Sequence, residues 1–148
     1  MKRIALVPVL LLLIMLTPVQ AQQETAQKFG DYVIHYNAVN TDFLTPEIAR
    51  NYGIQRSKNR VLVTVSVLKG EMGVAGQPVA ANIKAHATNL SDQTKSLNMR
   101  EIRDGNAIYY IDTFSVTNEE TVDIYIVAQP KSGGPKMDVK FRRQFFTK

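Results

Sequence analysis

The residues that could perform acid–base chemistry gather around His35. Asp31 and Asp42 flank this histidine along the chain, and Thr45 and Ser57 supply hydroxyl groups further on. An imidazole that is oriented by a carboxylate can activate a hydroxyl nucleophile, which is the arrangement of many hydrolases. In an extended strand, however, Asp31 and His35 lie about 13 Å apart, too far for a direct hydrogen bond. Asp42 could fold back towards His35, so a hydrolase stays open as a less favoured interpretation.

Other catalytic and metal-binding arrangements are poorly supported by the sequence. It contains no Gly-x-Ser-x-Gly, His-Glu-x-x-His, phosphate-binding loop or dinucleotide fingerprint. The absence of cysteine excludes thiol catalysis and thiolate metal sites. His35 and His86 are 51 positions apart and lack a metal-binding spacing, even with Asp31 and Asp42 beside His35. We therefore expect no catalytic residue, no metal site and no cofactor.

The first residues have the pattern of an export signal. Two basic residues precede an apolar run over residues 4–16, and small residues follow up to Ala21. The run is shorter than the roughly 20 residues that a membrane-spanning helix needs. We expect residues 1–21 to be a cleavable signal peptide and residues 22–148 to be one domain in the periplasm. An uncleaved anchor is the alternative.

Charge and composition limit the possible partners. Removing Lys2 and Arg3 with the signal peptide lowers the formal net charge from +5 to +3. This mild positive charge suits an anionic envelope surface or an acidic protein, while the lack of a basic and aromatic stacking run argues against nucleic acid. Without cysteine, the processed chain carries no lipoprotein anchor. We expect no stable membrane anchor after cleavage, and a periplasmic or envelope protein as partner.

Short apolar runs with a period of two dominate the chain from Phe29 onwards, which indicates strands. In the clearest run, Val61, Val63, Val65 and Val67 share one face. Asp104 and Gly105 form a turn signal between two such runs. The seven predicted strands cover residues 29–38, 61–68, 79–90, 95–103, 107–116, 121–129 and 137–146. This pattern predicts an all-β fold, an immunoglobulin-like antiparallel β-sandwich of about seven strands, with a small barrel as the alternative.

The segment over residues 39–60 interrupts the strand pattern. Its 22 residues exceed the usual length of a connection. Thr45 can cap a helix, Pro46 suits its first position and Gly53 suits its end, so we expect one short helix after the first strand. The segment and the strand before it hold the chain's densest mixture of polar, aromatic and basic residues. The candidate interaction surface consists of His35, Asn37, Asn40, Asp42, Tyr52, Arg56 and Lys58.

We expect this surface to serve a non-catalytic interaction module. The module would bind a protein or envelope component through residues 39–60, or through the strand at residues 137–146 if that strand is an edge. A pocket lined by Tyr36, Tyr52 and Arg56, which would bind a small ligand, is the alternative. The same polar residues could also serve only to cap and turn the backbone.

Several short stretches resemble a known family. They are Phe29–Tyr32, His35–Ala38, Asn40–Ala49, Tyr52–Ile54 and Arg56–Lys58. Together they look like the signature of DUF4426, a family of small exported proteins of Gram-negative bacteria. The resemblance covers essentially the whole chain after residue 21. It implies a periplasmic location and a β-sandwich, and it supplies no established activity and no catalytic residue.

Overall fold

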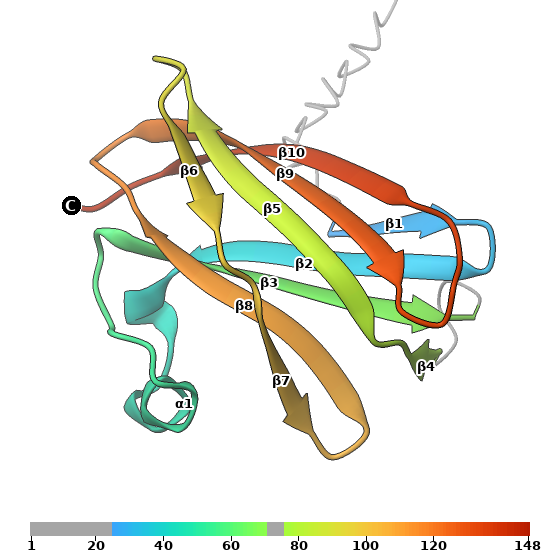
Figure 1. Ribbon diagram of the computed structural model, residues 1–148. Coiled ribbons are helices and arrows are strands. Elements are labelled where there is room, and N and C mark those ends of the chain that lie inside the picture. Colours follow the sequence, from blue (N-terminus) through green and yellow to red (C-terminus); the bar gives the residue numbers. More distant parts are fainter. Residues whose placement is uncertain (1–24, 71–75) are drawn as a thin grey trace, which may run out of the picture.

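The computed structural model describes residues 25–70 and 76–148. The predicted signal peptide at residues 1–21 lies outside the described residues, as does part of the connection after residue 70. Two antiparallel sheets face each other (Figure 1), which confirms the predicted β-sandwich over a closed barrel. No helix in the described part is long and apolar enough to cross a membrane.

Ten strands are distributed over the two sheets of the described chain. The six-stranded sheet has the order β1 (Ala26–Phe29), β2 (Tyr32–Asn40), β3 (Arg60–Lys69), β8 (Ala107–Ser115) and β7 (Arg100–Asp104), with β4 (Gln77–Pro78) also paired to β3. The four-stranded sheet has the order β10 (Met137–Phe145), β9 (Glu120–Pro130), β5 (Ala81–Asn89) and β6 (Thr94–Leu97). The last strand, β10, lies at the edge of this sheet, which is the condition for binding through residues 137–146, and its register with β9 is regular, without a bulge.

The structure has more strands than the seven predicted, because β1 lies almost entirely before the predicted start at Phe29, β4 precedes the strand predicted at residues 79–90, and one predicted strand is divided in two. Gly30 has φ 57° and turns the chain between β1 and β2. The predicted strand at residues 95–103 becomes β6 and β7, which belong to different sheets. The Asn98 N–H donates to Asp112 Oδ2 at 2.6 Å, where the chain passes from one sheet to the other. Local alternation does not reveal this change of sheet, because both halves are extended.

The core lies between the sheets and follows the predicted alternation. Val61, Val63, Val65 and Val67 on β3 are each 0% exposed. Across the interface, the rings of Tyr36 on β2 and Phe141 on β10 have centroids 4.7 Å apart. These contacts hold the sheets face to face through apolar burial, the main favourable contribution to folding.

The predicted short helix is α1 (Pro46–Tyr52), and it has the expected ends. The Ile48 N–H donates to Thr45 Oγ1 at 3.2 Å, and Gly53 ends the helix with φ 63°. A short 3₁₀ turn, η1 (Thr41–Phe43), precedes it. Thr41 is fully buried, donates from Oγ1 to the Gln55 carbonyl at 2.8 Å, and thereby ties the chain before the helix to the chain after it.

Candidate functional site

A second apolar cluster lies on the outer face of the six-stranded sheet. Leu62 alternates with the buried valines of β3, so its side chain points away from the core between the sheets. It packs with Ile54 and Ile111, which are also buried, and with four partly buried residues: Val39, Leu44, Tyr52 and Ile102. The outer face of an antiparallel sandwich is normally polar. Here α1 and the chain after it cover part of an apolar face.

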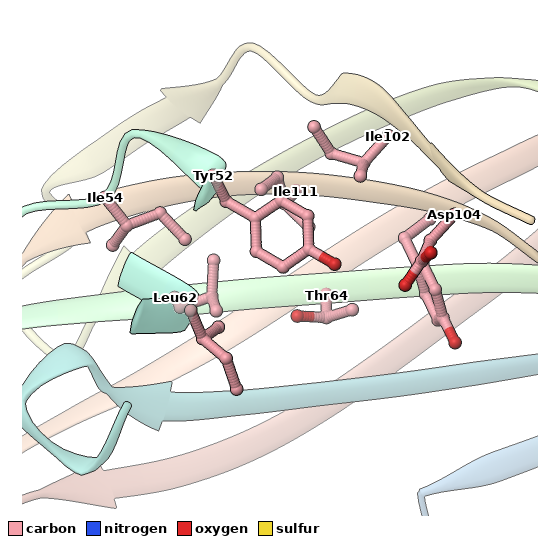
Figure 2. Close-up of a pocket in the computed structure, with 9 residues that line it drawn as sticks. Tyr52, Ile54, Leu62, Thr64, Ile102, Asp104 and Ile111 are labelled. Carbon is pink, nitrogen blue, oxygen red and sulfur yellow. The ribbon is translucent and has the colours of Figure 1, made fainter. Parts of the chain in front are cut away.

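The rest of this face forms a groove of about 270 Å³ beside α1. We call it the helix groove; it is lined by Ile48, Tyr52, Ile54, Leu62, Thr64, Ile102, Asp104, Tyr109 and Ile111. Figure 2 shows the Tyr52 ring lying over the strands that form its floor. Ile48 and Tyr109 are 42% and 37% exposed. The groove therefore presents apolar surface to solvent.

Helix α1, which forms one wall of the helix groove, is hydrogen-bonded to β7 at the edge of the six-stranded sheet. Arg100 on β7 donates from Nη2 to the carbonyl of Tyr52, the last residue of α1. A cation at this end of a helix also interacts favourably with the helix dipole. This contact positions Tyr52 above the floor, so the shape of the groove depends on β7 as well as on α1.

A second concave surface lies where the ends of β2 and β10 approach each other. We call it the end cleft; its volume is about 440 Å³ and it is lined by Ala38, Val39, Asn40, Asp42, Phe43, Lys58, Arg143, Gln144, Phe145, Phe146 and Lys148. Arg143 Nη1 donates to Asn37 Oδ1 at 2.9 Å and also to the Ala38 carbonyl. Asn40 Nδ2 donates to the Phe146 carbonyl at 3.1 Å. These polar side chains join the two sheets at this edge.

The end cleft is electropositive. Burial lowers the pKa of the Arg143 guanidinium below its ordinary value, and its Nε is buried without a hydrogen-bond partner among the described residues. Lys58 and Lys148 also line the cleft, and within the described chain none of these three cations forms an ion pair. Asp42 is the one acidic side chain in the lining, and its Oδ1 is likewise buried without a described partner.

The residues of the predicted interaction surface separate into different places. Asn40, Asp42 and Lys58 line the end cleft, and Asn37 contacts it through Arg143. Tyr52 lines the helix groove.

Two further residues of that surface lie in neither concavity. Arg56 is exposed and donates from Nη2 to the Asp42 carbonyl at 2.9 Å. His35 lies in a shallow depression with Ser66 and Tyr109 among its neighbours. The predicted small-ligand pocket is also not formed by its three expected residues, because Tyr36 is buried against Phe141 while Tyr52 lines the helix groove.

The hydroxyl groups considered for acid–base chemistry have structural partners. Thr45 Oγ1 caps α1, and Ser57 Oγ accepts from the Asn59 N–H at 3.1 Å. Neither residue lines the depression around His35, and neither Asp31 nor Asp42 does. The structure therefore does not bring the predicted base, orienting group and nucleophile together.

The two histidines lie in different sheets. His35 is in β2, whereas His86 is in β5, where its ring stacks on Tyr125 with centroids 4.6 Å apart. Among the described residues there is no group of three or more His, Cys, Asp or Glu side chains that could hold a metal ion.

The sequence does not predict the helix groove, because the residues that line it come from four segments that are separated along the chain. One local signal was available: Leu62 is apolar at a position where the alternation of β3 requires an outward side chain. Ile111 and Ile102 carry the same signal on β8 and β7. Apolar residues out of phase with a buried strand face indicate that something covers the outer face.

Comparison with known proteins places the chain in a family. The model of DUF4426, a domain of unknown function, matches residues 26–148. A DUF4426 family protein from Pseudomonas aeruginosa PAO1, solved by crystallography, is 31% identical with a TM-score of 0.69, and the match covers 83% of this chain and 94% of that chain. A search of curated proteins finds no match.

More distant structures share the fold alone. FetP of uropathogenic Escherichia coli strain F11, crystallised as isolated after recombinant expression in the periplasm of E. coli BL21(DE3), is 11% identical with a TM-score of 0.59, covering 82% of this chain and 92% of that chain. A copper-bound variant of FetP is 12% identical, also with a TM-score of 0.59, covering 81% and 93%. From the family match and the P. aeruginosa relative, the chain belongs to the DUF4426 family.

Proposed function

We propose that this domain is a non-catalytic binding module of the periplasm that holds a partner protein of the cell envelope in the helix groove. The observation that supports the proposal is the apolar outer face of the six-stranded sheet, of which α1 covers only a part. A groove with exposed apolar side chains at its rim, here Ile48 and Tyr109, is a candidate interaction site. The periplasmic location rests on the export signal at residues 1–21.

The dimensions of the helix groove favour an apolar protein segment over a small molecule. Small-molecule sites are typically clefts of roughly 300–1,000 Å³ that enclose most of the ligand. The helix groove is slightly smaller, at about 270 Å³, and its exposed residues Ile48 and Tyr109 leave it open to solvent. Five of its nine lining residues are isoleucine or leucine, and its polar groups are those of Thr64, Asp104 and the two tyrosines. An apolar side chain from a partner's surface would fill such a groove while the rest of the partner covers the rim.

A catalytic or copper-dependent role has less support. The hydroxyls near His35 in sequence are engaged in capping and turn contacts, as described above. Copper belongs to the FetP variant, whose 12% identity carries only the fold. In this chain His35 and His86 lie in separate sheets, so they offer no shared imidazole site. We therefore assign the domain to binding.

Groove variants provide the test. Ile48→Glu and Tyr109→Glu place a charge in the helix groove at exposed positions, so folding should be retained while apolar contact with a partner is lost. Leu90→Glu is the matched control, because Leu90 is 67% exposed in the connection between β5 and β6, away from the groove. A partner isolated with the wild-type domain and purified should bind the Leu90 variant normally and both groove variants at least about tenfold more weakly.

The same variants distinguish the alternative. In native mass spectrometry, the alternative predicts a small molecule that is bound to the wild-type domain and absent from Ile48→Glu. That result would show that the helix groove binds a small ligand and not a partner protein. Equal partner affinity in the groove and control variants, with melting temperatures unchanged, would contradict the helix groove as the binding site.

A further inference from the structure

The end cleft brings together two exposed phenylalanines from distant parts of the chain. Phe43 ends η1 and is 80% exposed, and Phe146 follows β10 and is 59% exposed. A single exposed apolar side chain needs no explanation, but both of these line one cleft. Since neither ring is buried in the sandwich, their common position favours contact with something outside the domain.

Positive charge surrounds these rings. Lys58, Arg143 and Lys148 line the same cleft, without ion-pair partners among the described residues. Asn37 and the Ala38 carbonyl hold the Arg143 guanidinium in place. A fixed cation and two lysines outnumber the carboxylates of Asp42 and of the carboxyl terminus at Lys148, which leaves a small net positive charge that attracts anions.

We propose that the end cleft is a membrane-contact surface that binds reversibly to bilayers containing anionic phospholipids. The two phenyl rings enter the boundary between headgroups and acyl chains, and the three cations contact lipid phosphates. This combination of exposed aromatic rings and unpaired cations on one surface matches the two components of an anionic bilayer, whereas a free phosphate would use the cations alone. Such contact is peripheral, and it requires no spanning helix or lipid anchor.

The end cleft is separate from the helix groove. The two share no lining residue, since the groove is formed by α1 with β3, β7 and β8, and the cleft by η1, Lys58 and the ends of β2 and β10. In Figure 1 the carboxyl terminus, which belongs to the cleft, lies at one end of the sandwich. A domain on the membrane surface could therefore hold a partner at the helix groove at the same time.

Vesicle sedimentation tests the proposal with the processed protein. The wild-type chain should sediment with phosphatidylcholine vesicles that contain phosphatidylglycerol and not with vesicles of phosphatidylcholine alone. Replacing both cleft lysines, as Lys58→Glu with Lys148→Glu, should weaken partitioning by at least about tenfold, because each basic residue near an anionic surface contributes on the order of fivefold. The pair Phe43→Ser and Phe146→Ser should weaken it by about tenfold through lost apolar insertion.

Matched variants elsewhere control for charge and hydrophobicity. Lys84→Glu with Lys136→Glu changes the net charge equally at exposed positions outside the end cleft, and Leu90→Ser removes an exposed apolar side chain. These controls should retain vesicle binding, apart from a small general charge effect. No sedimentation with anionic vesicles, equal loss in cleft and control variants, or binding of a poly-glutamate peptide in place of vesicles would overturn the proposal. Unchanged melting temperatures would establish that each variant is folded.

Discussion

The inner core and the helix groove are both apolar and share strands β3 and β8, yet the fold closes only the core. On β3, Val61 and Val63 face the opposite sheet and are fully buried, whereas Leu62 between them faces outwards beneath the chain that follows α1. The inner apolar surface packs against the second sheet in one buried cluster. The outer apolar surface meets a seven-residue helix and the chain after it, and the uncovered remainder is the groove. The comparison separates apolar residues that the fold buries from those at the rim of the groove, Ile48 and Tyr109, that it leaves exposed.

The largest effect on stability is expected inside. Ile124 is fully buried on β9, so Ile124→Ala should lower the free energy of unfolding by about 2–5 kcal/mol through lost burial and a residual cavity. Partner affinity of the folded fraction should stay unchanged. Denaturant unfolding measures the first quantity, and a loss below about 1 kcal/mol would show that the inner core is not closely packed.

Two adjacent tyrosines on β8 compare the two faces directly. The Tyr110 hydroxyl accepts from the Ala81 N–H at 2.8 Å and donates to Glu101 Oε2 at 3.0 Å. Tyr110→Phe leaves the buried Ala81 N–H without this acceptor and should cost about 1–3 kcal/mol of unfolding free energy. Tyr109→Phe, on the outer face, is the control and should cost less than about 0.5 kcal/mol. Equal effects in thermal unfolding would contradict this difference between the faces.

The outer face of the four-stranded sheet provides a polar contrast to the helix groove. On that face the Arg142 guanidinium donates to both oxygens of Asp123, at 2.6 and 2.8 Å, and this hydrogen bonding, together with the charges of Arg142 and Lys140, lowers the pKa of the Asp123 carboxyl. Because the folded-state pKa is below the unfolded value, the stabilisation is present above about pH 4 and is lost as the pH falls through the folded-state pKa.

Asp123→Asn should therefore cost about 0.5 kcal/mol near neutral pH, a small value because the Arg142 side chain of the pair is exposed, and almost nothing in strong acid. Unfolding free energies of wild type and variant across this pH range measure the effect. A difference between them that is independent of pH would exclude the carboxylate charge as its source.

The smallest effect on stability is expected at the rim of the helix groove. Ile48 is partly exposed, so Ile48→Ala should change the unfolding free energy by less than about 0.5 kcal/mol while weakening binding of the purified partner. Calorimetry of the free domain and titration with the partner measure the two quantities separately. A large loss of stability without a loss of affinity would make Ile48 part of the fold's own packing.

Sequence patterns over a few neighbouring residues correctly predicted the alternation within strands and the two ends of the helix. The alternating valines of β3, the cap at Thr45 and the turn at Gly53 were all confirmed, because each depends on neighbouring residues.

The two concave surfaces could be predicted only in part. The density of polar residues identified Asn40, Asp42 and Lys58, which do line the end cleft. It could not identify Phe43 and Phe146 as neighbours in this cleft, because they are 103 positions apart in the sequence. The helix groove likewise joins residues of α1 to three strands. Long-range strand pairing decides these contacts, and the period of a single strand does not encode it.

The most direct test of the helix groove as the binding surface is site-specific photo-crosslinking in cells. A photoreactive residue is placed at position 48 in the groove or at position 90, the equally apolar control outside it. We expect a discrete crosslinked protein from position 48 that is absent from position 90 and is lost when Tyr109→Glu is added, and that binds the purified wild-type domain. The same products from both positions, or products at position 48 that persist with Tyr109→Glu, would contradict the assignment of binding to the helix groove.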